Sequence, residues 1–514
     1  MLWLFQPMKT KRSLLLFATL LFVSFLFSRA EVRLPNVISS HAVLQRNRPI
    51  HIWGWASPGE TVTVRFHGQS RAATADDLGK WSLWLAPESA GGPYNLTAQG
   101  SGGAPVTLTD ILVGDVWLAS GQSNMEMPLN GFPGSAVIKN GAQEIAKANL
   151  PQVRLLRLEK KSSLYPQTDV SATWTECTAQ TAAEFSAVAY FFGREINQRE
   201  HVPIGLIDST WGGTPVEAWI SMDTIGSNAG MMPVFSYWAQ FTDDLADRDL
   251  ELAREKRQDE AAAQAGQPKP KHPWHPDGIS WQPAGLYNGM IAPLVPYTIQ
   301  GVIWYQGETN SNPVRAPYYA RFFRALISDW RTHWQEGNFP FLYVQISNFY
   351  SPNEDWGMVR DAQRRTLSVA NTAMAVTLDI GDRDNVHPAD KQTVGSRLAL
   401  AARALVYGEP QLEYSGPLFR TATVEGPAMR VWFDHAKDGL AVHGPQPEGF
   451  ELAGEDGKFV PATAKIDGQT VVVEASGVKH PTAVRYGWAS YTTANLFNKE
   501  GLPASTFTSV EKPD

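Results

Sequence analysis

The spacing of the apolar residues changes twice along this chain, and these changes divide it into three parts. From Glu31 to about residue 108, short segments in which apolar and polar residues alternate are separated by Gly- and Pro-containing turns. From 109 to about 410, nearly continuous apolar runs alternate with longer segments of helical spacing, and after 411 the short alternating segments return. Short alternating strands with frequent turns are typical of β-sandwiches. We therefore predict a small β-sandwich at each end, at 31–108 and 411–514.

The middle part, 109–410, is predicted to be a three-layer α/β/α domain. Nearly continuous apolar strands joined by helices indicate a parallel sheet that is covered on both faces. The predicted strands are Asp115–Ala119, Val153–Leu156, Ile204–Ile207, Gly301–Tyr305, Phe341–Ile346 and Met374–Asp379. The predicted helices include Ala187–Glu200, Tyr318–Trp334, Met358–Ala370 and Lys391–Tyr407.

An insertion at about 242–276 interrupts this alternation. Its first part, Thr242–Ala263, is charged and rich in alanine, which predicts an exposed helix, and Gly266–Pro276 is a Pro-rich surface arm. The arm is either a lid over a site or a simple insertion. His272 and His275 lie on this Pro-broken loop without a carboxylate partner, so the sequence favours no metal site there.

Composition narrows the classes of function. The net charge of −7 has no basic excess, which argues against nucleic acid as a partner. The 18 tryptophans suit either a large core or a sugar-binding cleft, because a flat apolar ring packs against C–H groups. Cys177 is the single cysteine, so neither an intrachain disulfide nor a cysteine metal cluster is possible.

Residues 1–30 have the features of a signal peptide. Basic residues precede the apolar run Leu14–Phe27, and Ser28-Arg29-Ala30 has the small-x-small pattern that precedes a cleavage site. The run is short for a membrane span, and the remainder shows no cationic amphipathic stretch. We expect a periplasmic or secreted protein without a membrane segment in its mature form.

Ser123 follows the first predicted strand of the middle part. The carboxyl end of a buried parallel strand opens into the ligand crevice of an α/β sheet, where a serine can act as a nucleophile. A serine after a turn also commonly caps the next helix. A nucleophile would need a base and an orienting partner within reach.

Asp384 and His387 form the tightest candidate pair. They follow the last predicted strand in a D-x-x-H spacing, so they are expected at the same sheet edge as Ser123. The carboxylate could orient one imidazole nitrogen while the other faces the serine. The alternative is a turn-forming aspartate beside an exposed loop histidine.

Two further loops at this edge offer polar groups. The segment Ser209–Pro215 contains Gly212 and Gly213, which allow close approach of backbone N–H groups to an oxyanion. The run Gly301–Asn310 carries three polar side chains directly after an apolar strand: Gln306, Glu308 and Asn310. Gln306 could donate to an oxyanion, whereas Glu308 and Asn310 could bind a substrate hydroxyl or form a structural network.

These blocks together resemble the SGNH hydrolases, and more specifically the sialate O-acetylesterase-like carbohydrate esterases. The resemblance rests on four blocks in order: Gly121-Gln122-Ser123-Asn124-Met125, Trp211–Trp219, Tyr305–Asn310 and Asp384-x-x-His387. It covers the chain from about 33 to 508 and implies a flavodoxin-like three-layer fold. The third block departs from the Gly-x-Asn-Asp pattern of the broad superfamily, which leaves Gln306 and Asn310 as alternative side-chain donors.

The resemblance implies a serine esterase that removes O-acetyl groups from glycans without a metal or another cofactor. Ser123 would be the nucleophile, His387 the base and Asp384 its orienter. The oxyanion donors would be the N–H groups of Ser123 and of Gly212 or Gly213, together with Gln306. We assign substrate binding to Glu308, Asn310 and Trp211. Glu126 receives no role.

The glycan itself is left open. A sialic acid would need an arginine near the cleft, and the candidates are Arg360, Arg364, Arg365 and Arg383. A neutral plant polysaccharide such as xylan or xyloglucan would use aromatic platforms, and the candidates are Trp274, Trp281, Trp356 and Trp488. The competing functions are a non-catalytic carbohydrate-binding protein and an SGNH esterase that acts on lipid or peptidoglycan esters.

Overall fold

The computed structural model describes residues 31–133 and 137–510; the predicted signal peptide at 1–30 lies outside the described residues. Its contacts divide the chain into two compact units. The described part of the first unit contains 31–34, 53–83 and 96–107, and the second contains 35–52, 84–95 and the chain from 108 onward.

The first unit is built from antiparallel strands. Strand β3 (Thr61–Phe66) pairs with β4 (Gln69–Thr74), which the sequence reading missed, and with residues 96–99 of β6 (Gly91–Gln99). Val62 and Val64 of β3 are fully buried, while the residues between them are not, as expected for a strand with one covered face. The other strands of the N-terminal region are β1 (Val43–Gln45), β2 (Ile50–Trp55) and β5 (Lys80–Leu85).

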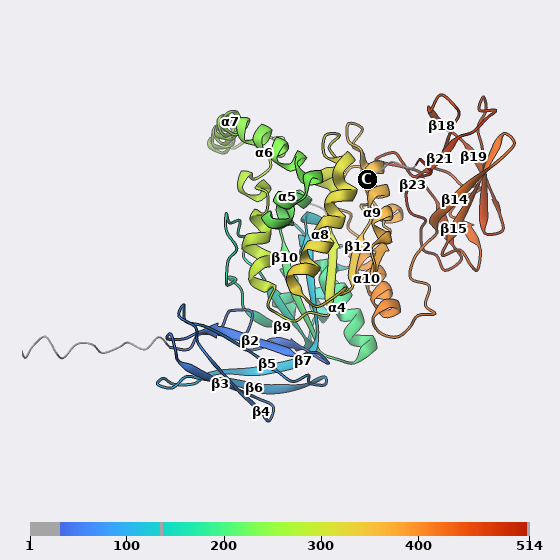
Figure 1. The fold of residues 1–514 in the computed structure, drawn as a ribbon. Helices are drawn as coiled ribbons and strands as arrows, with labels where there is room; N and C mark the ends of the chain where they lie inside the picture. Colours follow the sequence, from blue (N-terminus) through green and yellow to red (C-terminus); the bar gives the residue numbers. More distant parts are fainter. Residues whose placement is uncertain (1–30, 134–136, 511–514) are drawn as a thin grey trace, which may run out of the picture. The chain divides into compact units, whose positions relative to one another are not determined.

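A large and mainly parallel sheet forms the centre of the second unit (Figure 1). Its strand order is β13-β12-β11-β7-β10-β8-β9, and only the edge strand β9 runs antiparallel to its neighbour. The bounds are β7 (Val106–Gly121), β8 (Leu150–Arg157), β9 (Trp174–Cys177), β10 (Ile204–Thr210), β11 (Gly301–Tyr305), β12 (Phe341–Val344) and β13 (Thr372–Ala375). The mixed α/β architecture predicted for this region is therefore present.

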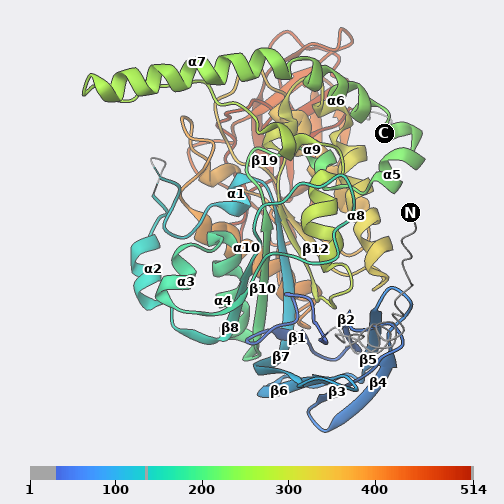
Figure 2. The ribbon, with the colours of Figure 1, turned by 90° about the vertical axis from the view of Figure 1, so that its left-hand side faces the viewer.

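Helices cover both faces of this sheet (Figure 2). Helices α4 (Ala187–Glu200) and α10 (Lys391–Leu405) pack against each other on one face, and α8 (Tyr319–Trp334) and α9 (Trp356–Arg365) pack together on the other. The α8 face is aromatic: buried Trp304 of β11 lies edge-on to Trp330 of α8, with ring centroids 5.7 Å apart. The shorter helices are α1 (Ser123–Glu126), α2 (Gly141–Lys147), α3 (Ala179–Ala183) and α5 (Met222–Ser227).

Several element boundaries differ from the sequence prediction, among them those of β7, β13 and α9. The segments at 106–108 and 115–119 belong to one 16-residue strand, β7. The last strand ends at Ala375 instead of Asp379, because its pairing with β12 stops there and a 3-10 turn follows at 378–380. Helix α9 ends at Arg365 instead of Ala370, because a 3-10 turn at 366–368 leads directly into β13.

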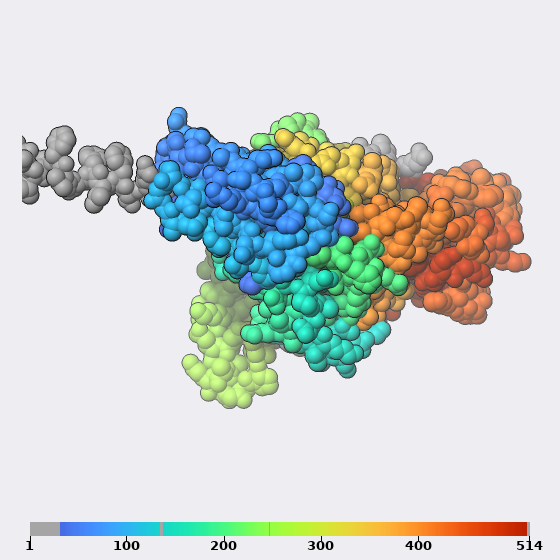
Figure 3. All heavy atoms as spheres, turned by 90° about the horizontal axis from the view of Figure 1, so that it is seen from below, coloured from blue at the N-terminus to red at the C-terminus, as the bar shows by residue number. Residues whose placement is uncertain are grey.

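The predicted insertion at about 242–276 consists of one long helix and an extended arm, and a shorter helix lies almost entirely before it. Helix α6 (Pro233–Asp243) is followed by α7 (Leu245–Gln264), which projects beyond the neighbouring helices (Figures 2 and 3). The arm then has no regular structure until a 3-10 turn at Gly278–Trp281. No helix among the described residues is both long enough and apolar enough to cross a membrane.

The C-terminal region contains antiparallel strands around a separate apolar core. Buried Val431, Val471, Leu452 and Phe507 belong to this core. The strands are β14 (Leu418–Glu425), β15 (Ala428–Asp434), β16 (Leu440–Val442), β17 (Phe450–Ala453), β18 (Phe459–Pro461), β19 (Thr463–Asp467), β20 (Thr470–Glu474), β21 (Ala483–Tyr486), β22 (Leu496–Asn498) and β23 (Phe507–Thr508).

Candidate active site

The carboxyl ends of three adjacent strands bring together three of the sequence blocks. Gly121 at the end of β7 pairs with Thr210 of β10 on one side and with Tyr305 of β11 on the other. Parallel strands end at a common edge, so the loops that follow them meet there. Gly121 has a φ of +131°, and a Cβ at this position would lie 2.2 Å from the carbonyl oxygen of Tyr305. A glycine is thus required for the turn that leads to Ser123.

A cavity of about 610 Å³ opens at this edge, a size typical of small-molecule sites. Its lining includes Ser123, Gly212, Gly213, Glu308 and His387. Ser123 is the first residue of α1, and its side chain caps no backbone group of this helix. The helix-cap interpretation of Ser123 therefore has no support in the structure.

His387 lies in the same cavity as Ser123, but Asp384 does not line it. The imidazole of His387 packs edge-on against Phe132, with ring centroids 5.5 Å apart. The carboxylate of Asp384 is 80% exposed and accepts a hydrogen bond from Nη1 of Arg383 at 2.9 Å. Among the described residues, no hydrogen bond joins the His387 ring to Ser123 or to Asp384. Catalytic hydrogen bonds often tighten only when substrate binds.

The two glycines of the second block differ in the state of their N–H groups. The N–H of Gly212 donates to Oε2 of Glu126, and the other carboxylate oxygen of Glu126 lies 2.6 Å from Nζ of Lys160. The N–H of Gly213 has no acceptor among the described residues, and the same is true of the Ser123 N–H. Glu126, which received no role in the sequence analysis, therefore holds the second block against the first.

Gln306 and Asn310 are buried behind the cavity and do not line it. Nε2 of Gln306 donates to Oδ1 of Asn310 at 2.6 Å and to the carbonyl of Thr214, while its Oε1 accepts from the hydroxyl of Tyr319. Nδ2 of Asn310 donates to Glu217 at 3.0 Å. These amides support the loops as a structural network, which was one of the two interpretations open for Asn310. The structure leaves neither amide directed at a substrate.

Glu308 both lines the cavity and belongs to a buried polar cluster. Its Oε1 accepts from Nδ2 of Asn124 at 2.5 Å, whereas its buried Oε2 has no partner among the described residues. Asn124 also donates to the carbonyl of Val386 at 3.0 Å and accepts from Nζ of Lys391. One asparagine next to the candidate nucleophile thus ties the third block to the histidine loop.

Burial sets the protonation of this cluster. Burial, with a smaller contribution from the Lys391 charge, lowers the pKa of His387 to about 4, so its imidazole is neutral near pH 7. Burial also lowers the pKa of Lys391 to about 7, although Glu308 opposes this shift. The pKa of Glu308 is raised, again mainly by burial. A neutral imidazole beside a serine is the form that general-base catalysis needs.

The candidate arginines are engaged elsewhere. Arg360 is fully buried and donates to backbone carbonyls including those of Ile346 and Ser490; Arg364 pairs with Asp361. Neither of them lines the cavity, and neither do Arg365 and Arg383. Trp274, Trp281 and Trp356 of the candidate aromatics line it, whereas Trp488 lies in another hollow. Trp211 is buried and does not line the cavity.

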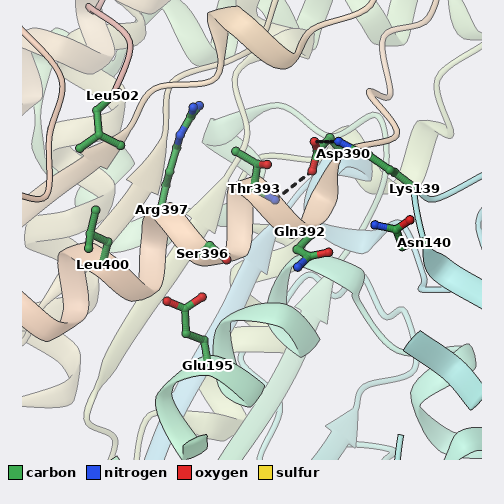
Figure 4. A pocket seen from close by; sticks show the side chains of 10 residues that line it. All are labelled: Lys139, Asn140, Glu195, Asp390, Gln392, Thr393, Ser396, Arg397, Leu400 and Leu502. Carbon is green, nitrogen blue, oxygen red and sulfur yellow. Dashed lines mark hydrogen bonds and ion pairs between the residues drawn. The ribbon is translucent and has the colours of Figure 1, made fainter. Parts of the chain in front are cut away.

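A separate cavity of about 470 Å³ lies beside the start of α10 (Figure 4). No histidine lines it. Lys139 pairs with Asp390 and Arg397 with Asp379, and the carboxylate of Glu195 also lines it. None of the residues predicted for the site lies in its wall.

The sequence reading missed several residues that organise the site. Gln122 was unassigned, yet its Oε1 accepts from the N–H groups of Gly307 and Thr309 at 3.3 Å and joins the first block to the third. Lys391 was read only as the start of a helix. For Gln122, the available signal was that it is a polar residue next to Ser123. For Lys391, the only signal was its position four residues after His387.

Comparisons with known proteins give a consistent result. A family model described as carbohydrate esterase, sialic acid-specific acetylesterase, matches residues 263–404. The sialate O-acetylesterase of Rattus norvegicus is 31% identical over 93% of this chain and 94% of its own length, and that of Mus musculus is 30% identical over 89% and 90%. The crystal structure of a carbohydrate acetylesterase from Xanthomonas citri has a TM-score of 0.80 and 38% identity, and the match covers 94% of this chain and 100% of that one.

Proposed function

Because the chain belongs to the sialate O-acetylesterase family of carbohydrate esterases, we propose that it is a serine esterase that removes O-acetyl groups from a glycan. The observation that carries the proposal is that Ser123 and His387, which are 264 positions apart (387 − 123), line one cavity at the sheet edge. The SGNH assignment has a topological support. Without β8 and β9, the sheet order is that of flavodoxin-like folds, with β7 as the first strand.

The chemistry follows the serine-esterase scheme. His387 takes the proton of the Ser123 hydroxyl while the oxygen attacks the acetyl carbonyl. The tetrahedral intermediate collapses, the C–O bond to the sugar breaks, and His387 returns the proton to the sugar oxygen. Water, deprotonated by His387, then attacks the acetyl-enzyme, the bond between the acetyl carbon and the Ser123 oxygen breaks, and His387 returns the proton to that oxygen as acetate is released. A role of Asp384 as the orienter of His387 requires its carboxylate to leave Arg383, and Asp384→Asn tests whether it does so.

The oxyanion is assigned to the N–H groups of Ser123 and Gly213. Both lie at the cavity and have no acceptor among the described residues, and preorganised N–H donors are the usual stabilisers of such an intermediate. The Gly212 N–H is bound to the Glu126 carboxylate. Nε2 of Gln306 already donates within the buried network. We therefore assign Gln306 to support of the loop and not to the oxyanion.

The charges of the cavity favour a neutral glycan. Three carboxylates line it (Glu126, Glu308 and Glu354) against one arginine, Arg315. Nε of Arg315 lies 3.1 Å from Oε1 of the buried Glu217, so its charge is already compensated. Glu126 is itself paired with Lys160, so the remaining negative charge of the wall comes from Glu308 and Glu354, and an additional substrate carboxylate would find no uncompensated cation there. We therefore propose that O-acetylated neutral sugars, such as those of xylan or xyloglucan, are preferred to O-acetyl sialic acids.

The experiment compares wild type with Ser123→Ala on 4-nitrophenyl acetate, O-acetylated xylo-oligosaccharides and O-acetylated sialosides. Acetate release should fall by at least about 10³-fold on all substrates in the variant, with an unchanged circular dichroism spectrum. Near-normal turnover by Ser123→Ala would disprove the serine mechanism. Covalent labelling by a fluorophosphonate in wild type alone would support it independently.

The second candidate is deacetylation of sialic acids. It is favoured by the names of the curated relatives and by Arg315, whose guanidinium remains at the cavity wall. The same substrate panel separates the two candidates. A higher kcat/KM on sialosides, lost in Arg315→Gln with little change on 4-nitrophenyl acetate, would replace the neutral-glycan assignment.

A further inference from the structure

Three tryptophans line the cavity, and two of them are already covered. Phe241 stacks on Trp281 at 5.0 Å, the guanidinium of Arg315 lies 4.4 Å from the Trp281 ring centroid, and the indole N–H donates to the carbonyl of Gly213 at 2.7 Å. Trp356 is only 1% exposed. Neither ring has a face that it can offer to a ligand.

The third, Trp274, is different. It lies in the Pro-rich arm, is 66% exposed, and has no aromatic or cationic partner among the described residues, yet it lines the cavity. Ligand pockets are commonly lined by aromatic side chains, so a ring in the cavity wall with a free face is available to contact a bound ligand. Its indole also lies against the second block, because a Cβ on Gly213 would come within 2.4 Å of its Cζ2 atom.

The arm is fastened to helix α7 on both sides of this indole. Before it, Nε2 of His272 lies 2.8 Å from Oδ1 of Asp259, and Nζ of Lys269 lies 2.9 Å from the other oxygen of the same carboxylate. After it, Nε2 of His275 lies 3.0 Å from Oε1 of Glu255. The two carboxylates are four residues apart on α7, hence on one face of the helix. The expectation that the two histidines lack carboxylate partners is therefore wrong, because helix α7 supplies them.

We propose that Trp274 is the platform on which a sugar ring of the substrate stacks, and that it is a specificity-determining residue of the esterase. The inference rests on the proposed function. A flat indole face packs against the C–H face of a neutral sugar ring. The indole is also close to the nucleophile. It lies against Gly213, and a Cβ on the preceding residue, Gly212, would lie 3.2 Å from Cβ of Ser123. A sugar on this indole would have its acetylated hydroxyl near the nucleophile.

On this basis helix α7 and the arm are a support for the platform. The histidine–carboxylate contacts hold the arm at fixed positions two residues before and one residue after Trp274, which limits the conformations of the indole without touching the substrate. His272 and His275 are therefore positioning residues, whereas Trp274 contacts the substrate.

The test measures kcat and KM of Trp274→Ala and Trp274→Phe on two substrates. These are 4-nitrophenyl acetate, which has no sugar, and the acetylated glycan that is best in the panel above. In Trp274→Ala, kcat/KM on the glycan should fall roughly tenfold, mainly through KM, while kcat/KM on the aryl acetate stays within about twofold. Trp274→Phe keeps an aromatic face and should recover most of the glycan activity.

Trp84→Ala is the matched control, because Trp84 is also an exposed tryptophan (53%) but does not line the cavity. It should leave both substrates unaffected. The paired substitution of His272 and His275 by alanine should raise KM for the glycan by a smaller factor than Trp274→Ala, and glutamine at both positions, which retains an N–H donor, should restore it.

Two results would overturn the proposal: unchanged glycan kinetics in Trp274→Ala, or equal losses on glycan and aryl acetate, which would make the indole part of the catalytic loop. Both are distinguishable from failure of the proposed function. If Ser123→Ala is inactive and Trp274→Ala is normal on the glycan, the esterase assignment stands and the platform does not.

Discussion

The two halves of the site are built in different ways. On one side, Ser123 and Glu308 follow strands at the sheet edge, and buried partners such as Gln122 and Asn124 hold them in place. On the other side, the 381–388 loop places His387 in the cavity but leaves Asp384 80% exposed on an arginine of the same loop. Among the described residues, one side chain of the first block bonds to this loop. Nδ2 of Asn124 donates to the carbonyl of Val386.

The difference shows which residues of the site have strictly fixed positions. Buried polar groups must be satisfied, so each hydrogen bond of the cluster constrains the others and a unique arrangement results. Exposed groups in a loop pay no such penalty when they exchange partners. Placement of the nucleophile is therefore a property of the sheet, whereas placement of the orienting carboxylate depends on the loop. Five predictions test this contrast, beginning with the largest effect.

Removal of the base should affect activity and not stability. His387→Ala should lower kcat on 4-nitrophenyl acetate about 10³-fold, because proton transfer by a positioned base contributes on the order of 10²–10⁴. The unfolding midpoint in urea should hardly change, since the imidazole makes no side-chain hydrogen bond among the described residues and its ring contact there is with Phe132. A large loss of stability would show that the loop is as tightly built as the sheet edge.

Removal of the buried ammonium should have the opposite profile. Lys391→Met leaves Oδ1 of Asn124 without its donor, which we expect to cost about 2 kcal/mol of unfolding free energy at pH 7. Urea denaturation measures this value, and Ser396→Ala on the same helix is the control. An unchanged midpoint would contradict a constraining role of the cluster.

The pH dependence of the free energy of unfolding is a second test of Lys391. The pKa of Lys391 is about 7 in the folded chain and near its ordinary 10.5 in the unfolded one. Between these values only the unfolded chain binds the proton, so this group makes stability rise with pH. Denaturation at pH 7 and 9 should show a rise in wild type that is smaller in Lys391→Met; equal rises would refute the prediction.

The pH profile of activity tests how Lys391 of the buried cluster acts on His387 of the loop. With the pKa of His387 lowered to about 4, by burial first and by Lys391 second, the base is neutral at pH 5 and the acid limb of kcat/KM should lie near pH 4. A normal histidine would lose activity near pH 6.5. Lys391→Met removes the cationic contribution and should shift the limb to higher pH; a limb near 6.5 in wild type would contradict the burial of His387.

The smallest effect is expected from the exposed carboxylate. Asp384→Asn should lower kcat less than about tenfold if the aspartate stays on Arg383 during turnover. A loss near 10⁴, the size observed when an orienting aspartate is made neutral, would show instead that Asp384 moves to His387 when substrate binds. Arg383→Gln is the informative companion, since it frees the carboxylate and should not impair the reaction in either case.

Local sequence patterns determined most of the framework. Strand β11 and helix α4 were predicted with their observed bounds, because an apolar run of five residues and a helical repeat of fourteen depend mainly on their own residues. The glycine turn before Ser123 and the blocks after the strands were likewise visible, which allowed the cavity residues Ser123, Gly213, Glu308 and His387 to be named from sequence.

Only the tertiary structure decided which polar groups remain available. Gln306 and Glu308 are two residues apart after the same strand, yet one is held in a buried network while the other reaches the cavity. The N–H of Gly212 donates to Glu126. Trp274 lies against Gly213 of the second block, and carboxylates of α7 bind the arm on both sides of it. Hydrogen-bond partners far apart in sequence leave no periodic pattern, because each is chosen by the three-dimensional neighbourhood alone.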